Sequence, residues 1–471
     1  MINITDKSEF LINELIGKDI VIFVGSAISM YPPTCLFSDT QFVEEIFASL
    51  FPKKFIDSIN FNEQKILKKL FNNIPFEHLL ERFPDREKLI QVLKNAYHIN
   101  KFNPLHQILA YLLHEGKIKA IITTNYDLCL DEALNKCNFE FLRIVTKNDF
   151  ETNNRNIKSK RTYFKIHGSA DDIKGETLVL TLTQESILPK WKRKVLYQLL
   201  ENKVLVITGY SGKDFEICPE LEQMPFEQII WNTNSEKLPS KNAGRILTQR
   251  NGTQLIEDMK ELLCGLFDHK LSHNLSYLKP NPRKDMLDKI SCGIIKNETE
   301  IEEWRASLLN STGIPSLALK ASNELLKSIT TKKSEQFISA LRQEAQALFH
   351  IGKYKYSAIL FHKALLVAKN LNNKYLEADL LLDESESLRC YGSFFRSIHN
   401  IKLASRISKD IRIKKERDRL LGKIFLRKAL LLEPFYQKFI RIKLSFFSQR
   451  INKKMPEYLQ KACSLSLESG N

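Results

Sequence analysis

The chain has 471 residues, of which 43% are hydrophobic and 27% are charged, a composition typical of globular proteins rather than of disordered or fibrous chains. No apolar run approaches the roughly 20 residues that span a bilayer, and Asp6, Glu9 and Glu14 stand where a signal peptide would be basic and then apolar. The eight cysteines are scattered and form no CxxC pair, which argues against a structural zinc site of the paired kind. We therefore expect a cytoplasmic protein that does not bind membranes.

The net charge of +16 is unevenly distributed. Residues 1–270 contain 35 Lys and Arg and 35 Asp and Glu, whereas residues 271–471 contain 36 and 20. This asymmetry predicts two modules with different surfaces. The basic part can bind nucleic acid or another acidic partner, although runs such as 409–423 are also typical of solvated helix faces.

Short apolar runs alternate with helical patterns over the first 270 residues. A typical helical pattern is 104–116, which ends at Gly116. The alternation predicts a Rossmann-like, doubly wound parallel α/β sheet, whose ligands bind at the carboxyl ends of the strands. The runs that indicate buried strands are 19–25, 119–124, 162–168, 204–210 and 228–233.

Small or polar residues follow each of the five predicted strands. In chain order they are GSAIS (25–29), TTNYD (123–127), HGS (167–169), GYSGKD (209–214) and NTN (232–234). Because the carboxyl ends of parallel strands share one edge of the sheet, we expect these loops to form one site.

The sequence pattern changes from about residue 270. Residues 270–285 contain two prolines and little periodicity and read as a loop, after which the pattern is almost wholly helical. Glycines at 313, 352 and 392 begin tracts spaced by 39 and 40 residues, with alanine or serine at matching offsets. Such a period predicts stacked helical hairpins. The predicted organisation is an α/β domain over 1–268, a linker over 269–296 and an all-α domain over 297–471.

The five loops, in this order, resemble the sirtuin-like domains of bacterial anti-phage defence proteins, and the helical tracts resemble tetratricopeptide repeats. The resemblance implies that GSAIS wraps the pyrophosphate of NAD+, through Gly25, Ser26, Ala27 and Ser29. Ala27 departs from the family pattern, which has a second glycine there. The resemblance also implies that the helical repeats bind a protein partner.

The resemblance makes Asn125 and His167 the catalytic residues. Asn125 would orient the nicotinamide ribose and a water, and His167, with an ordinary pKa near 6.5, would act as the base. Further NAD+-binding positions are implied in the second, fourth and fifth loops: Thr124, Asp127, Gly209, Ser211, Asp214 and Asn232. No metal is expected in the site.

The implied activity is hydrolysis of NAD+ to nicotinamide and ADP-ribose, in an abortive response to a phage or host protein trigger. Deacylases of the family usually carry a four-cysteine zinc module, which this chain lacks, so water is favoured over acyl-lysine. A protein deacylase, a non-catalytic NAD+ or ADP-ribose sensor and a nucleic-acid scaffold remain as alternatives. Because repeat domains often assemble, we expect a homo-oligomer.

Each of these residues also has a structural interpretation. Asn125 is a candidate helix N-cap, His167 a core histidine, and GYSGKD an ordinary loop. Cys129 and Cys137 are expected in the core. The histidines at 78, 98, 106 and 114 are expected to be structural, with His106 able to pack near the pocket.

Overall fold

The computed structural model describes residues 17–172, 174–212, 214, 216–233, 245–248, 293, 298–441 and 456–465. The chain divides into two compact units, which we call the first and the second unit. The first comprises Met1–Ile46, Pro75–Glu81 and Asp85–Ile294, and the second comprises Phe47–Ile74, Arg82–Pro84 and Ile295–Asn471. The predicted boundaries at 268 and 296 lie outside the described residues and stay predictions.

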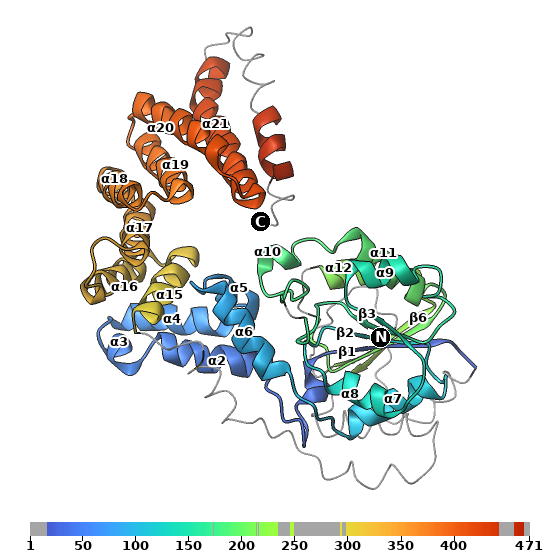
Figure 1. Ribbon diagram of the computed structural model, residues 1–471. Helices are drawn as coiled ribbons and strands as arrows, with labels where there is room; N and C mark the ends of the chain where they lie inside the picture. Colours follow the sequence, from blue (N-terminus) through green and yellow to red (C-terminus); the bar gives the residue numbers. More distant parts are fainter. Residues whose placement is uncertain are drawn as a thin grey trace. The chain divides into compact units, whose positions relative to one another are not determined.

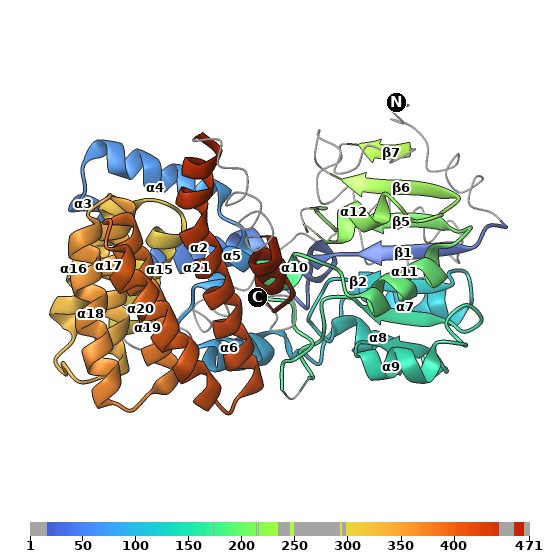
Figure 2. The ribbon, with the colours of Figure 1, turned by 90° about the horizontal axis from the view of Figure 1, so that it is seen from above.

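The first unit is built on a seven-stranded sheet with the order β3-β4-β2-β1-β5-β6-β7. Every neighbouring pair is parallel, and Figure 2 shows the strands from β7 to β2 in this order. The predicted doubly wound α/β fold is confirmed. The strands are β1 (Ile20–Val24), β2 (Ala120–Thr123), β3 (Leu142–Ile144), β4 (Thr162–Lys165), β5 (Val204–Thr208), β6 (Gln228–Thr233) and β7 (Arg245–Thr248).

Helices cover both faces of this sheet. Figure 1 shows α7 and α8 on one face and α9, α11 and α12 on the other. The helices of the first unit include α5 (Phe76–Glu81), α6 (Arg86–Tyr97), α7 (Pro104–His114), α8 (Cys129–Lys136), α9 (Lys147–Asn153), α10 (Leu182–Glu185), α11 (Lys190–Leu200) and α12 (Ile217–Leu221). Residues 26–29 form a short 3₁₀ turn, and α2 spans Asp39–Leu50.

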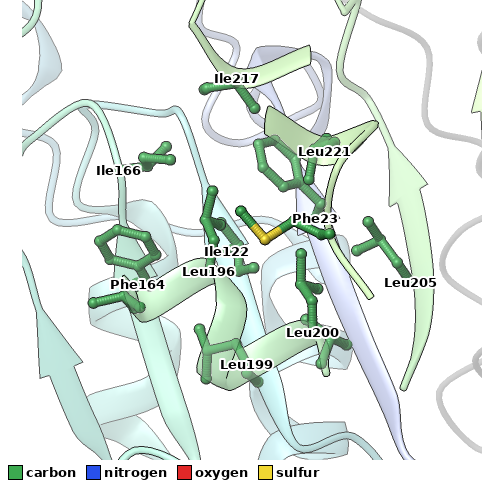
Figure 3. Close-up of a cluster of buried hydrophobic side chains, with 14 of the residues drawn as sticks. Phe23, Ile122, Phe164, Ile166, Leu196, Leu199, Leu200, Leu205, Ile217 and Leu221 are labelled. Carbon is green, nitrogen blue, oxygen red and sulfur yellow. The ribbon is translucent and has the colours of Figure 1, made fainter. Parts of the chain in front are cut away.

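Strand β1 is buried on both faces, as its continuous apolar sequence predicts. Ile20, Ile22 and Val24 pack in the core on the side of α7 and α8. Val21 and Phe23 belong to the opposite core, where Leu196, Leu199 and Leu200 of α11 cover the sheet (Figure 3). The two cores hold the central strands rigidly, so the loops at their carboxyl ends are presented from a fixed frame.

The second unit is helical throughout the part of it that the structure describes, in agreement with the predicted all-α domain. Residues 47–74, which lie between β1 and β2 in the sequence, belong to this unit rather than to the α/β unit. Its helices are α3 (Lys53–Asp57), α4 (Phe61–Asn73), α15 (Glu298–Ser311), α16 (Pro315–Ser328), α17 (Glu335–His350), α18 (Tyr354–Asn370), α19 (Lys374–Cys390), α20 (Phe394–Ile407), a short 3₁₀ turn (Ser408–Asp410), α21 (Lys414–Arg441) and a helix over residues 456–465.

A buried arginine ties residues 47–74 to the helices of this unit. Arg305 on α15 is 5% exposed, donates through Nε to the Leu50 carbonyl, and lies with its guanidinium 4.8 Å from the centre of the Phe55 ring. A charged donor on a carbonyl that ends a helix, stacked on an aromatic ring, stabilises both partners. Lys320 of α16 adds a second link, since its ammonium donates to the Ser58 carbonyl, and both contacts join residues 47–74 to the second unit despite their place in the sequence.

The predicted glycine period marks the turns between paired helices. A glycine stands between the end of one helix and the start of the next at three turns. These are Gly313, Gly352 and Gly392, with positive φ values of 72°, 86° and 92°. Such a turn requires the left-handed region that glycine adopts without strain. The matching alanines, Ala364 and Ala404, are fully buried where helices approach closely.

The matching serines of the repeat pack against α19 from its two neighbours. The Ser357 hydroxyl lies 2.9 Å from the Ser387 hydroxyl, and the Ser397 hydroxyl donates to the Ser385 carbonyl at 2.7 Å. Serine at this offset therefore satisfies its hydroxyl across the helix pair, which gives the sequence period a physical cause.

Within the described residues, no helix combines the length and the low charge that a bilayer crossing would require.

Replacing Ala404 with Leu tests the packing of the helical repeat. Ala404 is 0% exposed, so three extra carbons have no room and should destabilise the second unit by about 1–3 kcal/mol. The matched control is Arg406→Leu on the exposed face of α20. Urea unfolding followed by helical circular dichroism measures the difference, and equal midpoints for the two variants would contradict the helix register.

Candidate active site

The loops that follow β1, β2, β4 and β5 enclose one pocket at the carboxyl edge of the sheet. The pocket contains about 630 Å³ of space not filled by atoms, including a part open to solvent. Residues from α2, α5 and α6 complete its wall. The lining residues are Ser26, Ser29, Leu36, Phe37, Asp39, Phe76, Glu77, Tyr97, Thr124, Asn125, Tyr126, Asp127, His167, Gly209, Tyr210, Ser211 and Asp214.

The structure brings most of the predicted site residues together. The catalytic and binding positions that line the pocket are Ser26, Ser29, Thr124, Asn125, Asp127, His167, Gly209, Ser211 and Asp214. Gly25 and Ala27 lie in the first loop but do not line the pocket. Asn232 lies in β6, opposite Leu247 of β7, and its side chain is outside the described part of the chain. The functional roles of all these residues stay predictions.

Gly25 and Gly209 meet where the loops after β1 and β5 cross. The Gly25 N–H donates to the Thr208 carbonyl and the Ala27 N–H donates to the Gly209 carbonyl, both at 3.2 Å. A Cβ on Gly25 would lie 2.7 Å from the Tyr210 Cα, a distance that no side chain tolerates. Gly25 has extended backbone, with φ −118°, so it is the close approach of the two loops, and not a left-handed conformation, that requires glycine here.

The Ser29 hydroxyl is the centre of a buried hydrogen-bond network. It donates to Asp127 Oδ2 at 2.9 Å and accepts from Asn125 Nδ2 at 3.3 Å. Ser29 is 1% exposed and Asp127 is 4% exposed, so these bonds form away from water, where an unmade bond costs most. The network fixes the Asn125 side chain with its Oδ1 buried and without a hydrogen-bond partner.

Asn125 is not the cap of the helix that follows it. The first N–H of α8, on Cys129, is bound by Asp127 Oδ1 at 3.0 Å. The Asn125 N–H instead donates to the Thr123 hydroxyl at 3.0 Å. The N-cap interpretation of Asn125 is therefore wrong, because Asp127 satisfies the helix end and leaves the amide to the pocket.

His106 completes the network from α7, and its hydrogen bonds define its tautomer. The Asn103 N–H donates to His106 Nδ1 at 3.3 Å, so the proton of the neutral ring is on Nε2. This nitrogen lies 3.1 Å from the Ser29 hydroxyl and donates to it. Burial, only partly opposed by the Asp127 charge, lowers the pKa of His106 from 6.5 to about 4. The ring is neutral at physiological pH and holds Ser29 in its donating orientation towards Asp127.

A buried ion pair supports the loop after β2 from β4. Lys165 is fully buried, lies 3.1 Å from Asp131 Oδ2 and donates to the Asp127 carbonyl. Arg143 donates to the other oxygen of Asp131 at 2.6 Å. Burial opposes ionisation of Asp131, but Lys165 and Arg143 outweigh it and hold its pKa below the usual range. The paired charges fix the backbone that carries Asn125.

His167 lies in an acidic environment. It is 4% exposed, and its Nε2 lies 2.9 Å from Glu216 Oε1. Burial lowers the pKa of His167, but Glu216 and Asp214 outweigh it, so the net shift is upward. Burial is also the main cause that raises the pKa of Glu77 to about 7. None of the described lining residues is Lys or Arg, so the pocket favours groups that carry positive charge.

Several of these residues carried no local sequence signal. Asp39, Glu77 and Tyr97 reach the pocket from helices that precede β2. Glu216, in the segment before α12, contacts His167 from outside the lining. His106 was expected to be structural and able to pack near the pocket, and it does contact the lining residue Ser29. In the sequence, its place three residues after the N-cap Asn103 points to a fixed orientation.

Comparison with known families gives one match. Residues 119–224 match the model of the SIR2-like domain, which supports a sirtuin-like domain in the first unit. The match covers less than a quarter of the chain and includes the loops after β2, β4 and β5, but not the loop after β1. No curated protein matches the chain.

The neutral His106 predicts a loss of stability in acid. The unfolded chain binds a proton near pH 6.5 that the native ring does not bind until about pH 4, so the free energy of unfolding falls as the pH falls through this window. The expected contribution is on the order of 3 kcal/mol. Urea unfolding between pH 7 and 4.5 measures it. His106→Gln should flatten this dependence, whereas the exposed His98→Gln should retain it; equal slopes in the two variants would contradict a neutral His106.

Proposed function

We propose that the first unit hydrolyses NAD+ to nicotinamide and ADP-ribose. The observation that carries the proposal is the convergence of Asn125 and His167, which follow the neighbouring strands β2 and β4, on one pocket. The SIR2-like match, which includes both residues, supports an NAD+-dependent reaction there.

The residue types suit cleavage of an N-glycosidic bond. The bond between the ribose and the nicotinamide breaks, the pyridinium leaves as neutral nicotinamide, and positive charge develops on the ribose carbon. Water then forms the new C–O bond and releases a proton. Asp39, Glu77 and Asp214 line the pocket, and none of the lining residues that the structure describes is Lys or Arg. Each of these acids that is ionised stabilises the developing cation.

The Asn125 side chain is held in an orientation that leaves its Oδ1 able to accept a hydrogen bond. Its Nδ2 is bound by Ser29, and its Oδ1 is buried and unpaired. A buried oxygen without a partner is costly, and a water or ribose hydroxyl would satisfy it. Asn125 therefore orients the ribose or the attacking water.

His167 is the group that takes the proton. Its Nε2 faces the Glu216 carboxylate at 2.9 Å, so the neutral ring donates from Nε2 and accepts a proton at Nδ1. The neighbouring acids raise its pKa, which increases the basicity of the neutral form. Water is favoured as nucleophile over acyl-lysine, because the sequence has no CxxC pair for the zinc module of the deacylases.

We further propose that the second unit regulates this activity in a cell. Stacked helix pairs present extended surfaces to protein partners, so a phage or host protein is the proposed trigger and a homo-oligomer the proposed active form. Loss of NAD+ would then stop the metabolism of an infected bacterial cell. The basic charge of residues 271–471 supports an acidic partner as well.

The activity is tested with an assay for nicotinamide release and with expression in bacteria. Wild type should deplete cellular NAD+ and arrest growth, and Asn125→Ala and His167→Ala should each reduce nicotinamide release by about 100-fold or more. Asn135→Ala and His98→Ala, at exposed positions, are the matched controls and should behave as wild type.

The toxicity comparison remains informative if the purified protein needs a trigger. Equal toxicity of wild type and Asn125→Ala with unchanged NAD+ would rule out the enzymatic function. Binding of NAD+ without release of nicotinamide, both alone and in cells, would favour the sensor alternative.

A further inference from the structure

Three buried side chains beside the pocket combine the donor atoms of a metal site. His167 follows β4, Glu185 ends α10, and Glu216 precedes α12. Their exposed fractions are 4%, 1% and 5%. One imidazole nitrogen and one oxygen from each carboxylate all lie within 4.8 Å of one another, which is close enough for a single ion to bind all three.

Both carboxyl groups of this cluster have an oxygen without a hydrogen bond. Glu185 Oε1 and Glu216 Oε2 are buried and have no hydrogen-bond partner, and Asp214 Oδ2 nearby shares this condition. A buried acceptor left unpaired costs about 1–3 kcal/mol, more if it is charged. A ligand that supplies positive charge at this point would remove the cost for several oxygens at once.

One protein cation lies near this cluster. The charge of Lys192 acts on Glu216 and on His167, and its ammonium donates to the Ile166 carbonyl. The charges of Glu77, Glu216 and Asp214 all act on Glu185, so the acidic groups of this region outnumber Lys192 and His167. Protons shared between carboxyl groups or a bound cation can neutralise such a cluster.

We propose that His167, Glu185 and Glu216 bind a divalent transition-metal ion of the Mn²⁺ or Zn²⁺ class. One imidazole and two carboxylates suit these ions better than Ca²⁺ or Mg²⁺, which prefer oxygen alone. His167 lines a pocket that is open to solvent, so a hydrated ion has a path to the site. This inference differs from the metal-free site expected from the sequence, and the site itself does not depend on the proposed function.

The ion has a consequence for the proposed reaction, and this consequence does rest on the proposed function. A metal on Nε2 takes the lone pair of that nitrogen, so the proton that Nε2 donated to Glu216 moves to Nδ1 and the ring stays neutral. Nδ1 then carries a proton and has no lone pair with which to accept another, so His167 no longer acts as the base. The bound ion therefore inhibits hydrolysis, and a chelator relieves the inhibition.

Equilibrium binding of Mn²⁺ to the full-length, chelator-treated protein tests the site without any need for turnover. Free Mn²⁺, followed by electron paramagnetic resonance, should show one saturable site in wild type. Glu185→Gln and Glu216→Gln should each weaken it by about tenfold or more. The control is Glu176→Gln, at an exposed position between β4 and α10, which should bind as wild type does.

Absence of saturable Mn²⁺ binding, or binding unchanged in both variants, would overturn the site and show that protons alone neutralise the cluster. Thermal unfolding without metal identifies a variant that fails to fold. In that case, Mn²⁺ binding by the other variant and by His167→Ala decides whether the site exists. Because the assay measures Mn²⁺ binding and not turnover, its result stands even if the protein does not hydrolyse NAD+. Binding confirmed without inhibition would overturn only the proposed consequence.

Discussion

The candidate site depends on the hydrogen bonds of the Ser29 hydroxyl. It joins the loop after β1 to the loop after β2 and to helix α7, through Asp127, Asn125 and His106. Each partner is buried, so the network is satisfied only in one arrangement. This arrangement determines where the Asn125 oxygen points, and the close packing of Gly25 on the Gly209 loop holds the whole set at the centre of the sheet.

The fold and the main loops of the site could be predicted from the sequence because their signals are local. Continuous apolar runs are typical of strands buried on both faces, and each such run is followed at once by small or polar residues. The glycine spacing in the second unit was equally local, since Gly352 and Gly392 each occupy a turn that needs a positive φ. The strand β3, with three residues, was too short to give a comparable pattern.

The remainder of the site depends on contacts between distant segments. Glu77 and Glu216 are separated by about 140 positions in the sequence, and neither stands in a motif. Their environment arises only when α5 and the segment before α12 pack around His167. Residues 47–74 are a similar case, because the buried Arg305 that binds Leu50 gives no sign of its partner in the sequence. Burial then determines the protonation of these groups, which a pattern of residue types does not show.

The central claim is that the strand ends form one NAD+ site around Asn125 and His167. A crystal structure of the full-length protein with a non-hydrolysable NAD+ analogue tests it most directly. The account predicts the nicotinamide ribose, or a water beside it, within hydrogen-bond distance of Asn125 Oδ1, with His167 on the same pocket wall. An analogue bound away from this pocket, or an Asn125 oxygen still without a partner in the complex, would contradict the account.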